Sequence, residues 1–360
     1  MTLQPPKHFR IGKTQLTLLE ELTNANGVSG NEKEVRELVR KQVAPHADEI
    51  NVDAMGNMLV IKHAKKNNPL KLMMAAHMDE VGLMIVDEDS DGLYSFVVVG
   101  GIDERQLLSK TVNVGDDKIP GIIGSKPIHL AESDELHSII PVQSMRIDIG
   151  PANKSKVKVG DYAAFATKFM HSGDSLFAKA LDDRLGVAAL IEILKIVPDH
   201  IEFLAAFTVQ EEIGLRGARV AAYGFNPDLA IVIDSTPAFD LPRPDENENT
   251  QYNCRLDAGP AIYLSDAGTL SDPRLIRFLE KIAKENKIPY QFRQPGGGGT
   301  DAGAIHKTRS GIPSVSVSVP GRYAHTPIML ARVKDWENTI ILLQKALETI
   351  SPATLAAERA

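Results

Sequence analysis

The chain has 360 residues, of which 43% are hydrophobic and 24% are charged, and its net charge is -7 at pH 7. This balance is typical of a globular protein, and the length predicts one large domain or two smaller ones. The acidic balance argues against nucleic acid as a partner. The single cysteine, Cys254, excludes an internal disulfide framework and a cysteine-rich metal site.

The apolar runs fall short of the roughly 20 residues that a membrane-spanning helix needs. The first ten residues lack the apolar core of a signal peptide. We therefore expect no membrane partner and a cytoplasmic location, with which one cysteine is consistent.

Before residue 80, apolar spacing predicts two helices, the first over residues 13–24 and the second starting after Glu32. Ser29 and Glu32 form the pattern of a capping box at the start of the second helix. Short strands follow, and the last of them is a continuous apolar run typical of a buried strand: residues 50–52, 58–61 and 72–76.

Residues 80–165 are rich in Val, Ile and Gly and show almost no helical periodicity. Strand-like pieces recur there at residues 94–99, 111–114, 121–124 and 145–149. We predict that residues 80–165 form a small β-barrel-like domain. It would be inserted into one discontinuous domain made of residues 1–79 and 166–360.

After Asp182 the predicted helices and strands alternate. They are, in chain order, helix 184–197, strand 203–209, helix 218–223, strand 229–233, helix 273–285, strand 313–319 and helix 336–350. The strands are almost uniformly apolar, so we predict an α/β fold with a mixed, mostly parallel sheet sandwiched by helices.

Side chains that bind metals stand at the ends of four predicted strands and at the mouth of one helix. They are His77, Glu211 with Glu212, Asp234 and His325, and, at the helix, Asp182. Ligands of open α/β sheets bind at the carboxyl ends of strands. Each residue alone has a simpler reading, such as a turn, a helix cap or a solvated acidic pair. Their coincidence predicts a metal site of carboxylates and imidazoles without sulfur.

The local spacing suggests how the work could be divided. A carboxylate can bind two metals through its two oxygens, so Asp182 is the best-placed bridging ligand. Asp183 is then left to cap the helix or to pair with Arg184. Glu211 and Glu212 are adjacent and point in different directions, so one can bind metal while the other serves as a general base.

Asp79 follows His77 by two residues, so in an extended chain the two side chains share a face. Asp79 can then orient the imidazole, as a carboxylate often does for a metal-bound histidine.

Six segments of the chain are recognisable together: residues 76–82, 180–184, 209–214, 232–234, 299–302 and 322–327. They resemble the M42 family of dinuclear metalloaminopeptidases, the glutamyl or deblocking aminopeptidases that build tetrahedral particles. The resemblance runs from about residue 15 to about residue 350 and includes the inserted segment.

The resemblance implies a zinc-peptidase-like fold and an enzyme that removes the N-terminal residue from short peptides with two divalent metal ions. Zinc or cobalt would be expected, with manganese as an alternative. It implies that His77 and Asp234 are terminal ligands of one metal, and that Glu212 and His325 are terminal ligands of the other. Asp182 would bridge the two metals. Glu211 would be the general base, and Asp79 would support His77. It also implies that the insertion makes dimer contacts and that dimers assemble into a dodecamer.

Two other readings remain open at this point. The same site could serve a metal-dependent N-acyl amino acid or peptide amidohydrolase, a deblocking enzyme, because function follows pocket shape rather than fold. A non-enzymatic scaffold with a vestigial site would predict missing ligands, and none is missing.

The glycine run at residues 296–299 lacks the lysine and the spacing of a phosphate-binding loop. We expect it to let the backbone run close to the substrate. A preference for acidic substrates would require a basic group in the pocket, and Arg322 is a candidate that the sequence alone leaves ambiguous.

Overall fold

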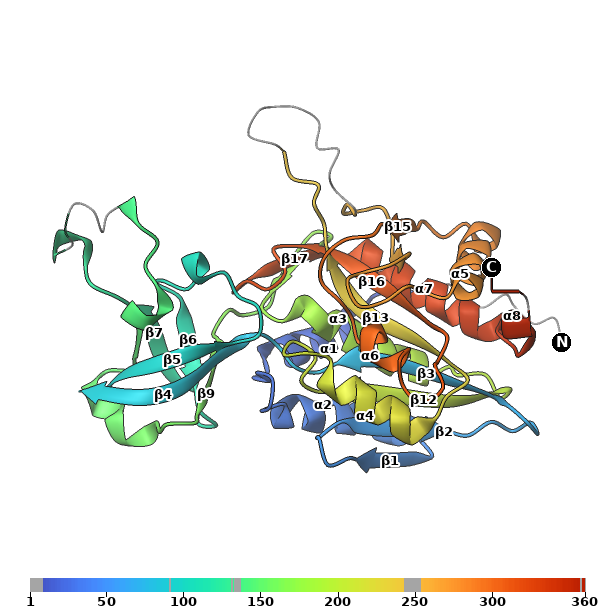
Figure 1. Cartoon of the computed structure of the whole chain (residues 1–360), viewed down its shortest axis with the longest axis horizontal. Coiled ribbons are helices and arrows are strands. Elements are labelled where there is room, and N and C mark those ends of the chain that lie inside the picture. The colour runs from blue at the N-terminus through green and yellow to red at the C-terminus, as the bar shows by residue number, and fades with distance from the viewer. Residues whose placement is uncertain are drawn as a thin grey trace.

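The structure is a computed structural model that describes residues 9–90, 92–130, 132, 137–242, 254–356 and 358–359. Two bodies make up the molecule: a large α/β body, and a smaller body of strands on the left of Figure 1. No helix in the described ranges combines the length and the apolar composition that crossing a membrane requires.

The large body is built on an 11-stranded sheet. Nine strands follow in spatial order: β1 (Glu49–Val52), β2 (Met58–Lys62), β12 (Ile201–Thr208), β3 (Leu70–His77), β13 (Leu229–Pro237), β16 (Ser314–Arg322), β17 (Met329–Arg332), β11 (Ser175–Ala178) and β10 (Met170–Ser172). Two short strands, β14 (Ala261–Tyr263) and β15 (Gln291–Arg293), pair beside β16. The four central strands β12, β3, β13 and β16 run parallel, so their carboxyl ends meet at one edge.

The buried strand β3 shows why this sheet is covered on both faces. Its side chains alternate between two hydrophobic clusters, with Leu72 and Met74 in one and Met73 and Ala75 in the other. Successive side chains of a strand point to opposite faces, so a continuous apolar run requires cover on both.

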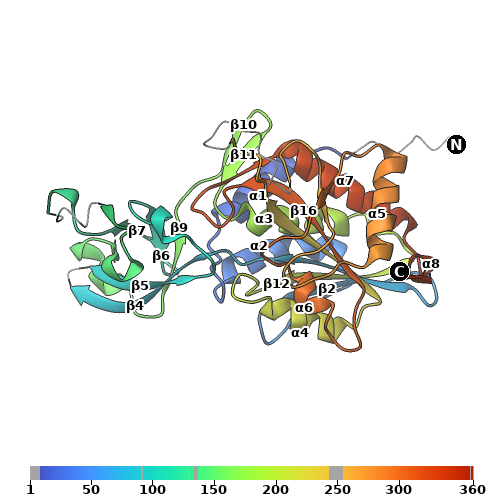
Figure 2. The same ribbon diagram turned by 45° about the horizontal axis from the view of Figure 1, so that its top comes forward.

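Helices supply that cover (Figure 2). One face packs against α1 (Lys13–Asn24), α2 (Lys33–Val43), α3 (Leu181–Leu194), α5 (Pro273–Asn286) and α7 (Val333–Thr349). The other face packs against α4 (Arg216–Phe225) and α6 (Ala302–Ile305), while the short α8 (Ala353–Ala356) contacts α5.

The smaller body is a closed antiparallel barrel with its own hydrophobic core. Its strands, in order around the barrel, are β4 (Gly82–Ser90), β5 (Leu93–Val99), β8 (Arg146–Asp148), β7 (Ile119–Gly124), β6 (Thr111–Val114) and β9 (Tyr162–Phe165). Leu83 and Ile85 of β4 point into the core, whereas Val86 is exposed. Closure pairs both edge strands, which an open sheet would leave free to associate.

The predicted fold class is therefore confirmed: a mixed sheet with a parallel centre lies between helices, and a closed barrel accompanies it. Two local predictions were wrong. The Ser29 hydroxyl donates to Asp79 Oδ2 at 2.5 Å, and α2 has no side-chain cap, so no capping box forms. Asp234 lies inside β13 rather than after it, because the strand continues to Pro237.

Candidate metal centre

The carboxyl edge of the parallel strands collects all the predicted ligand side chains. His77 is the last residue of β3, and Thr208, the last residue of β12, is its register partner. Glu211 and Glu212 follow β12, and His325 follows β16. Chain segments far apart in sequence meet here because parallel strands end at the same edge.

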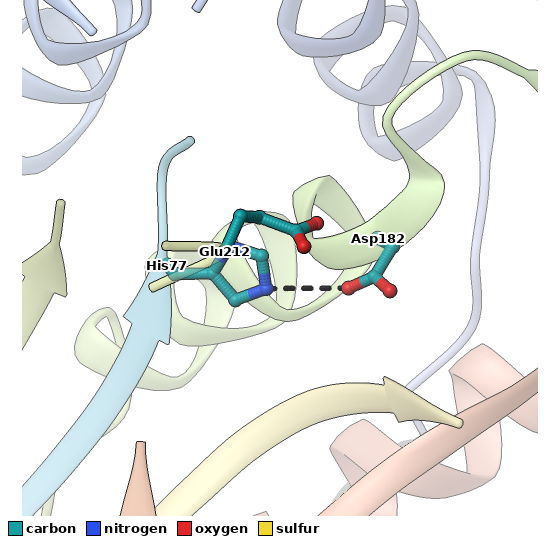
Figure 3. A group of neighbouring side chains, drawn as sticks. All are labelled: His77, Asp182 and Glu212. Atoms are coloured by element: carbon teal, nitrogen blue, oxygen red, sulfur yellow. Dashed lines mark hydrogen bonds and ion pairs between the residues drawn. The ribbon is translucent and has the colours of Figure 1, made fainter. Parts of the chain in front are cut away.

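Asp182 stands between two groups of these side chains. Its Oδ1 atom lies 3.2 Å from His77 Nε2, a contact drawn in Figure 3, and Asp234 Oδ1 lies 3.7 Å from the same nitrogen. The other carboxylate oxygen, Asp182 Oδ2, lies 3.6 Å from His325 Nε2, which is itself 3.4 Å from Glu212 Oε2. The two oxygens of one carboxylate therefore face two different sets of side chains.

The two imidazoles are oriented through their other ring nitrogen. His77 Nδ1 lies 3.2 Å from the carbonyl oxygen of Asp79, and His325 Nδ1 lies 2.9 Å from the carbonyl oxygen of Gly101. In the neutral form of each ring, a proton on Nδ1 would be donated to these carbonyls, and the electron pair of Nε2 would be available to a metal ion. Gly101 follows barrel strand β5, so the barrel contributes one of these two acceptors.

The Asp79 side chain organises the turn after β12. Its oxygens accept the backbone N–H groups of Glu211 at 3.0 Å and Glu212 at 3.2 Å, and Oδ2 also accepts the Ser29 hydroxyl. Its Oδ1 lies 3.6 Å from His77 Nδ1. The buried carboxylate thus touches His77 and fixes the backbone of both glutamates.

Asp183 has a local structural role. Its Oδ1 accepts the N–H of Gly186 at 2.9 Å, which caps the regular part of α3, and its Oδ2 accepts the N–H of His77 at 3.3 Å. The expected alternative of a pair with Arg184 is wrong, because the Arg184 guanidinium turns to Glu80, with Nη2 3.4 Å from Oε1.

The carboxyl groups at this edge crowd one another in a buried setting. Burial raises the pKa of Glu212 to about 8 and that of Asp234 to about 6, and it raises the pKa of Glu211 well above its usual value. Burial is the largest influence on Asp182 and opposes its ionisation, but the hydrogen bond from protonated His77 and the positive charges of His77 and His325 together outweigh it and lower the pKa of this carboxyl. The pKa of His77 rises well above its ordinary value because neighbouring carboxylates outweigh its burial.

This donor set fits divalent metal ions. His77, Asp182 and Glu212 offer ligand atoms that all lie within 4.8 Å of one another, and so do His77, Asp183 and Asp234. Nitrogen and oxygen donors of this kind suit zinc, cobalt and manganese. Cations would also offset the repulsion among the buried acids, which the protein side chains do only in part.

A cavity of about 820 Å3 opens beside these side chains. His77, Asp182, Glu211, Glu212, Asp234 and His325 line one side of it. The remaining wall includes Phe239, Tyr263, Arg293 and the glycines at 297–299.

The comparisons with known proteins identify the family. A family model described as M42 glutamyl aminopeptidase matches residues 56–342, and a second, described as AMPT, matches residues 13–38. The chain belongs to the M42 glutamyl aminopeptidase family. It is therefore a peptidase, a hydrolase of peptide bonds.

Relatives of this M42 chain match it almost from end to end. The lysyl aminopeptidase of Pyrococcus furiosus is 33% identical over 347 residues, covering 93% of this chain and 97% of the relative. The TET aminopeptidase from Thaumarchaeota archaeon SCGC AB-539-E09 superposes with a TM-score of 0.89 at 34% identity, over 96% of this chain and 99% of that one. The Pyrococcus horikoshii TET1 peptidase, which is described as able to assemble into a tetrahedron or a large octahedral shell, has a TM-score of 0.79 at 32% identity, over 92% of this chain and 98% of that one.

Sequence reasoning missed several residues of this M42 site, among them Ser29 and Arg293. Ser29 contacts Asp79 from a segment 50 residues earlier, and its capping-box pattern concealed that contact. Arg293 lines the cavity from a strand of only three residues, too short for a periodicity signal. The candidate Arg322 is instead paired with Asp240 at 2.6 Å.

Proposed function

We propose that this M42 enzyme removes the N-terminal residue from short peptides with two divalent metal ions. His77 and Asp234 would hold one ion, Glu212 and His325 the other, and Asp182 would bridge them. The observation that carries this proposal is that Asp182 Oδ1 faces His77 while Asp182 Oδ2 faces His325, at 3.2 and 3.6 Å from the imidazole nitrogens. Zinc or cobalt suits these donors, with manganese as an alternative.

The metals would supply polarisation of the scissile carbonyl and a lower pKa for an attacking water. Glu211 would accept a proton from that water at its carboxylate and return it to the leaving amine. Two features support this role: Glu211 lines the cavity, and its backbone is fixed by Asp79. Asp79 would act by holding His77, Glu211 and Glu212 in place.

We also propose assembly through the barrel, in the cytoplasm, first to dimers and then to a dodecamer. The solved relatives support this idea, because one is described as a dodecamer and another as a tetrahedral or octahedral shell. The barrel also presents apolar side chains to solvent, among them Ile122 and Ile139.

A metal-dependent substrate screen tests the activity. Metal-stripped protein would be reloaded with zinc, cobalt or manganese and assayed with aminoacyl-p-nitroanilides and with the same residues N-acylated. We expect cleavage of the free-amine substrates only, and only after metal is added. Faster cleavage of the acylated series would instead establish the deblocking amidohydrolase, which no relative compared above supports.

A further inference from the structure

Arg293 is a buried cation in the wall of the substrate cavity. It ends strand β15, beside Tyr263 at the end of the parallel strand β14. The residue is only 4% exposed, yet it lines the cavity that also holds the proposed metal ligands. Its position is therefore set by the sheet rather than by a free loop.

The hydrogen bonds of Arg293 leave its charge unpaired. Nη1 donates to the carbonyl of Gln294 at 2.6 Å and Nη2 donates to the carbonyl of Gly297 at 3.0 Å, while the buried Nε atom has no acceptor. The guanidinium carbon lies 5.4 Å from the centroid of the Tyr263 ring. Among the described residues, no carboxylate comes within ion-pair distance of this guanidinium.

Three other buried or half-buried arginines have acidic partners. Arg322 pairs with Asp240, Arg184 with Glu80, and Arg274 with Asp272. Burying a charge without a counter-charge is costly, so a buried arginine normally has an anionic partner. Arg293 departs from this pattern at a site where a substrate would lie.

The surrounding wall leaves room for such a partner. A Cβ atom added at Gly297, Gly298 or Gly299 would meet no heavy atom within 4 Å, so the glycine run borders open space. The acids that line the cavity are Asp182, Glu211, Glu212 and Asp234, which are already assigned to the proposed metal centre. Within the described ranges the cavity wall therefore offers Arg293 no free carboxylate, and a bound molecule can supply one.

We propose that Arg293 binds a carboxylate of the peptide substrate, which makes it a specificity-determining residue. The proposal rests on the aminopeptidase function proposed above. A planar guanidinium can bind a carboxylate through two parallel N–H donors. Three N–H groups of Arg293 have no acceptor among the described residues, which is enough for such a pair. That carboxylate has two sources in a short peptide: an acidic first side chain, or the C-terminus of a dipeptide.

Matched substrate pairs separate the two sources. Glutamyl- and glutaminyl-p-nitroanilide have side chains of nearly the same size and differ in the charge of the first residue. Leucyl-leucine and its amide differ only in the terminal charge. With the metal-loaded, full-length enzyme, we expect kcat/KM to favour the charged member of one pair by at least about tenfold.

Variants then assign that preference to Arg293. Arg293→Met keeps most of the side-chain volume and should remove the preference. Arg293→Lys keeps the charge but loses the two-pronged geometry and should leave a smaller preference. Arg322→Met is the matched control, because Arg322 already has Asp240 as a partner, and it should leave the ratio unchanged. Both members of a pair are measured on one preparation, so partial misfolding cancels from the ratio.

The outcomes are distinct. A glutamyl preference assigns the side-chain carboxylate, and a dipeptide preference assigns the C-terminus. The proposal is overturned if the wild type shows neither preference, or if the preference survives in both Arg293 variants. If the wild type cleaves none of the four substrates with any metal, the proposed aminopeptidase function itself fails.

Discussion

Asp182 and Asp183 are neighbours in sequence with different surroundings. The Asp182 side chain lies between the two imidazoles, whereas the Asp183 side chain accepts backbone N–H groups of His77 and Gly186. The strand-end rule predicted that His77 and His325 meet at one edge, because it depends only on where apolar runs stop, and the family resemblance implied Asp182 as the bridge between them. No local pattern shows that Asp183 reaches back to His77, since the two residues are 106 positions apart.

Glu211 offers the sharpest residue-scale prediction. Glu211→Gln removes the proton acceptor while keeping the size of the side chain and the backbone hydrogen bond to Asp79. We expect kcat to fall by at least about 100-fold while metal content stays at the wild-type level. Stopped-time assays measure kcat, and elemental analysis measures the metal content. Activity close to wild type in this variant would rule out Glu211 as the base.

At the scale of elements, the long helices and central strands were predicted from periodicity, and α1 and β6 have the predicted bounds. The short strands β14, β15 and β17 were missed, because three or four residues carry no readable period. Their positions are fixed instead by pairing with β16 and with each other. Part of the cavity wall was therefore hidden from the sequence.

A buried ion cluster joins the elements behind the site. Lys179 Nζ lies 2.7 Å from Glu80 Oε1 and donates to the carbonyl of Ala25, so it links the segments that follow α1, β3 and β11. Lys179→Met should lower the free energy of unfolding by about 3–5 kcal/mol, because it leaves Glu80 with fewer counter-charges. The control Lys65→Met removes an exposed pair with Asp199 and should cost at most about 1 kcal/mol. Equal losses in urea unfolding would contradict the assigned role of the cluster.

Asp335, in the first turn of α7, gives a pH-dependent prediction. Burial raises its pKa to about 6, although it accepts the N–H groups of Asp257 and Gly259. The folded state then binds the Asp335 proton more tightly than the unfolded state does. The contribution of this proton to the free energy of unfolding is therefore full below about pH 4 and is lost as the pH rises through 6. The wild type should lose unfolding free energy between pH 4 and pH 6.5. Asp335→Asn should lose about 2–3 kcal/mol less than the wild type over the same range. Identical pH slopes in urea titrations would show that Asp335 does not titrate in this way.

For the whole molecule, the sequence predicted a β insertion, and the structure shows a closed barrel over β4 to β9. The sequence could not show that the barrel contacts the proposed metal centre, through the carbonyl of Gly101 on His325, because that contact joins residues 224 positions apart. A contact between subunits on the barrel would therefore lie next to the segment that orients His325, a proposed metal ligand.

Assembly through the barrel can be tested with one substitution. Ile122 is 45% exposed on β7, so Ile122→Glu should break an apolar contact there without entering the barrel core. Light scattering should show a smaller particle than for the wild type. The matched control Val220→Glu, at a 41% exposed position on α4, should leave the particle size unchanged. An unchanged particle in the Ile122 variant would place the interface elsewhere.

The central claim is that Asp182 bridges two metal ions. The most direct test measures the metal content per subunit after equilibration with zinc, in the wild type, in Asp182→Ala and in Asp183→Ala. We expect two ions in the wild type, loss of both in Asp182→Ala, and retention of both in Asp183→Ala at reduced stability. Two ions retained in Asp182→Ala, or both lost only in Asp183→Ala, would contradict the bridging assignment.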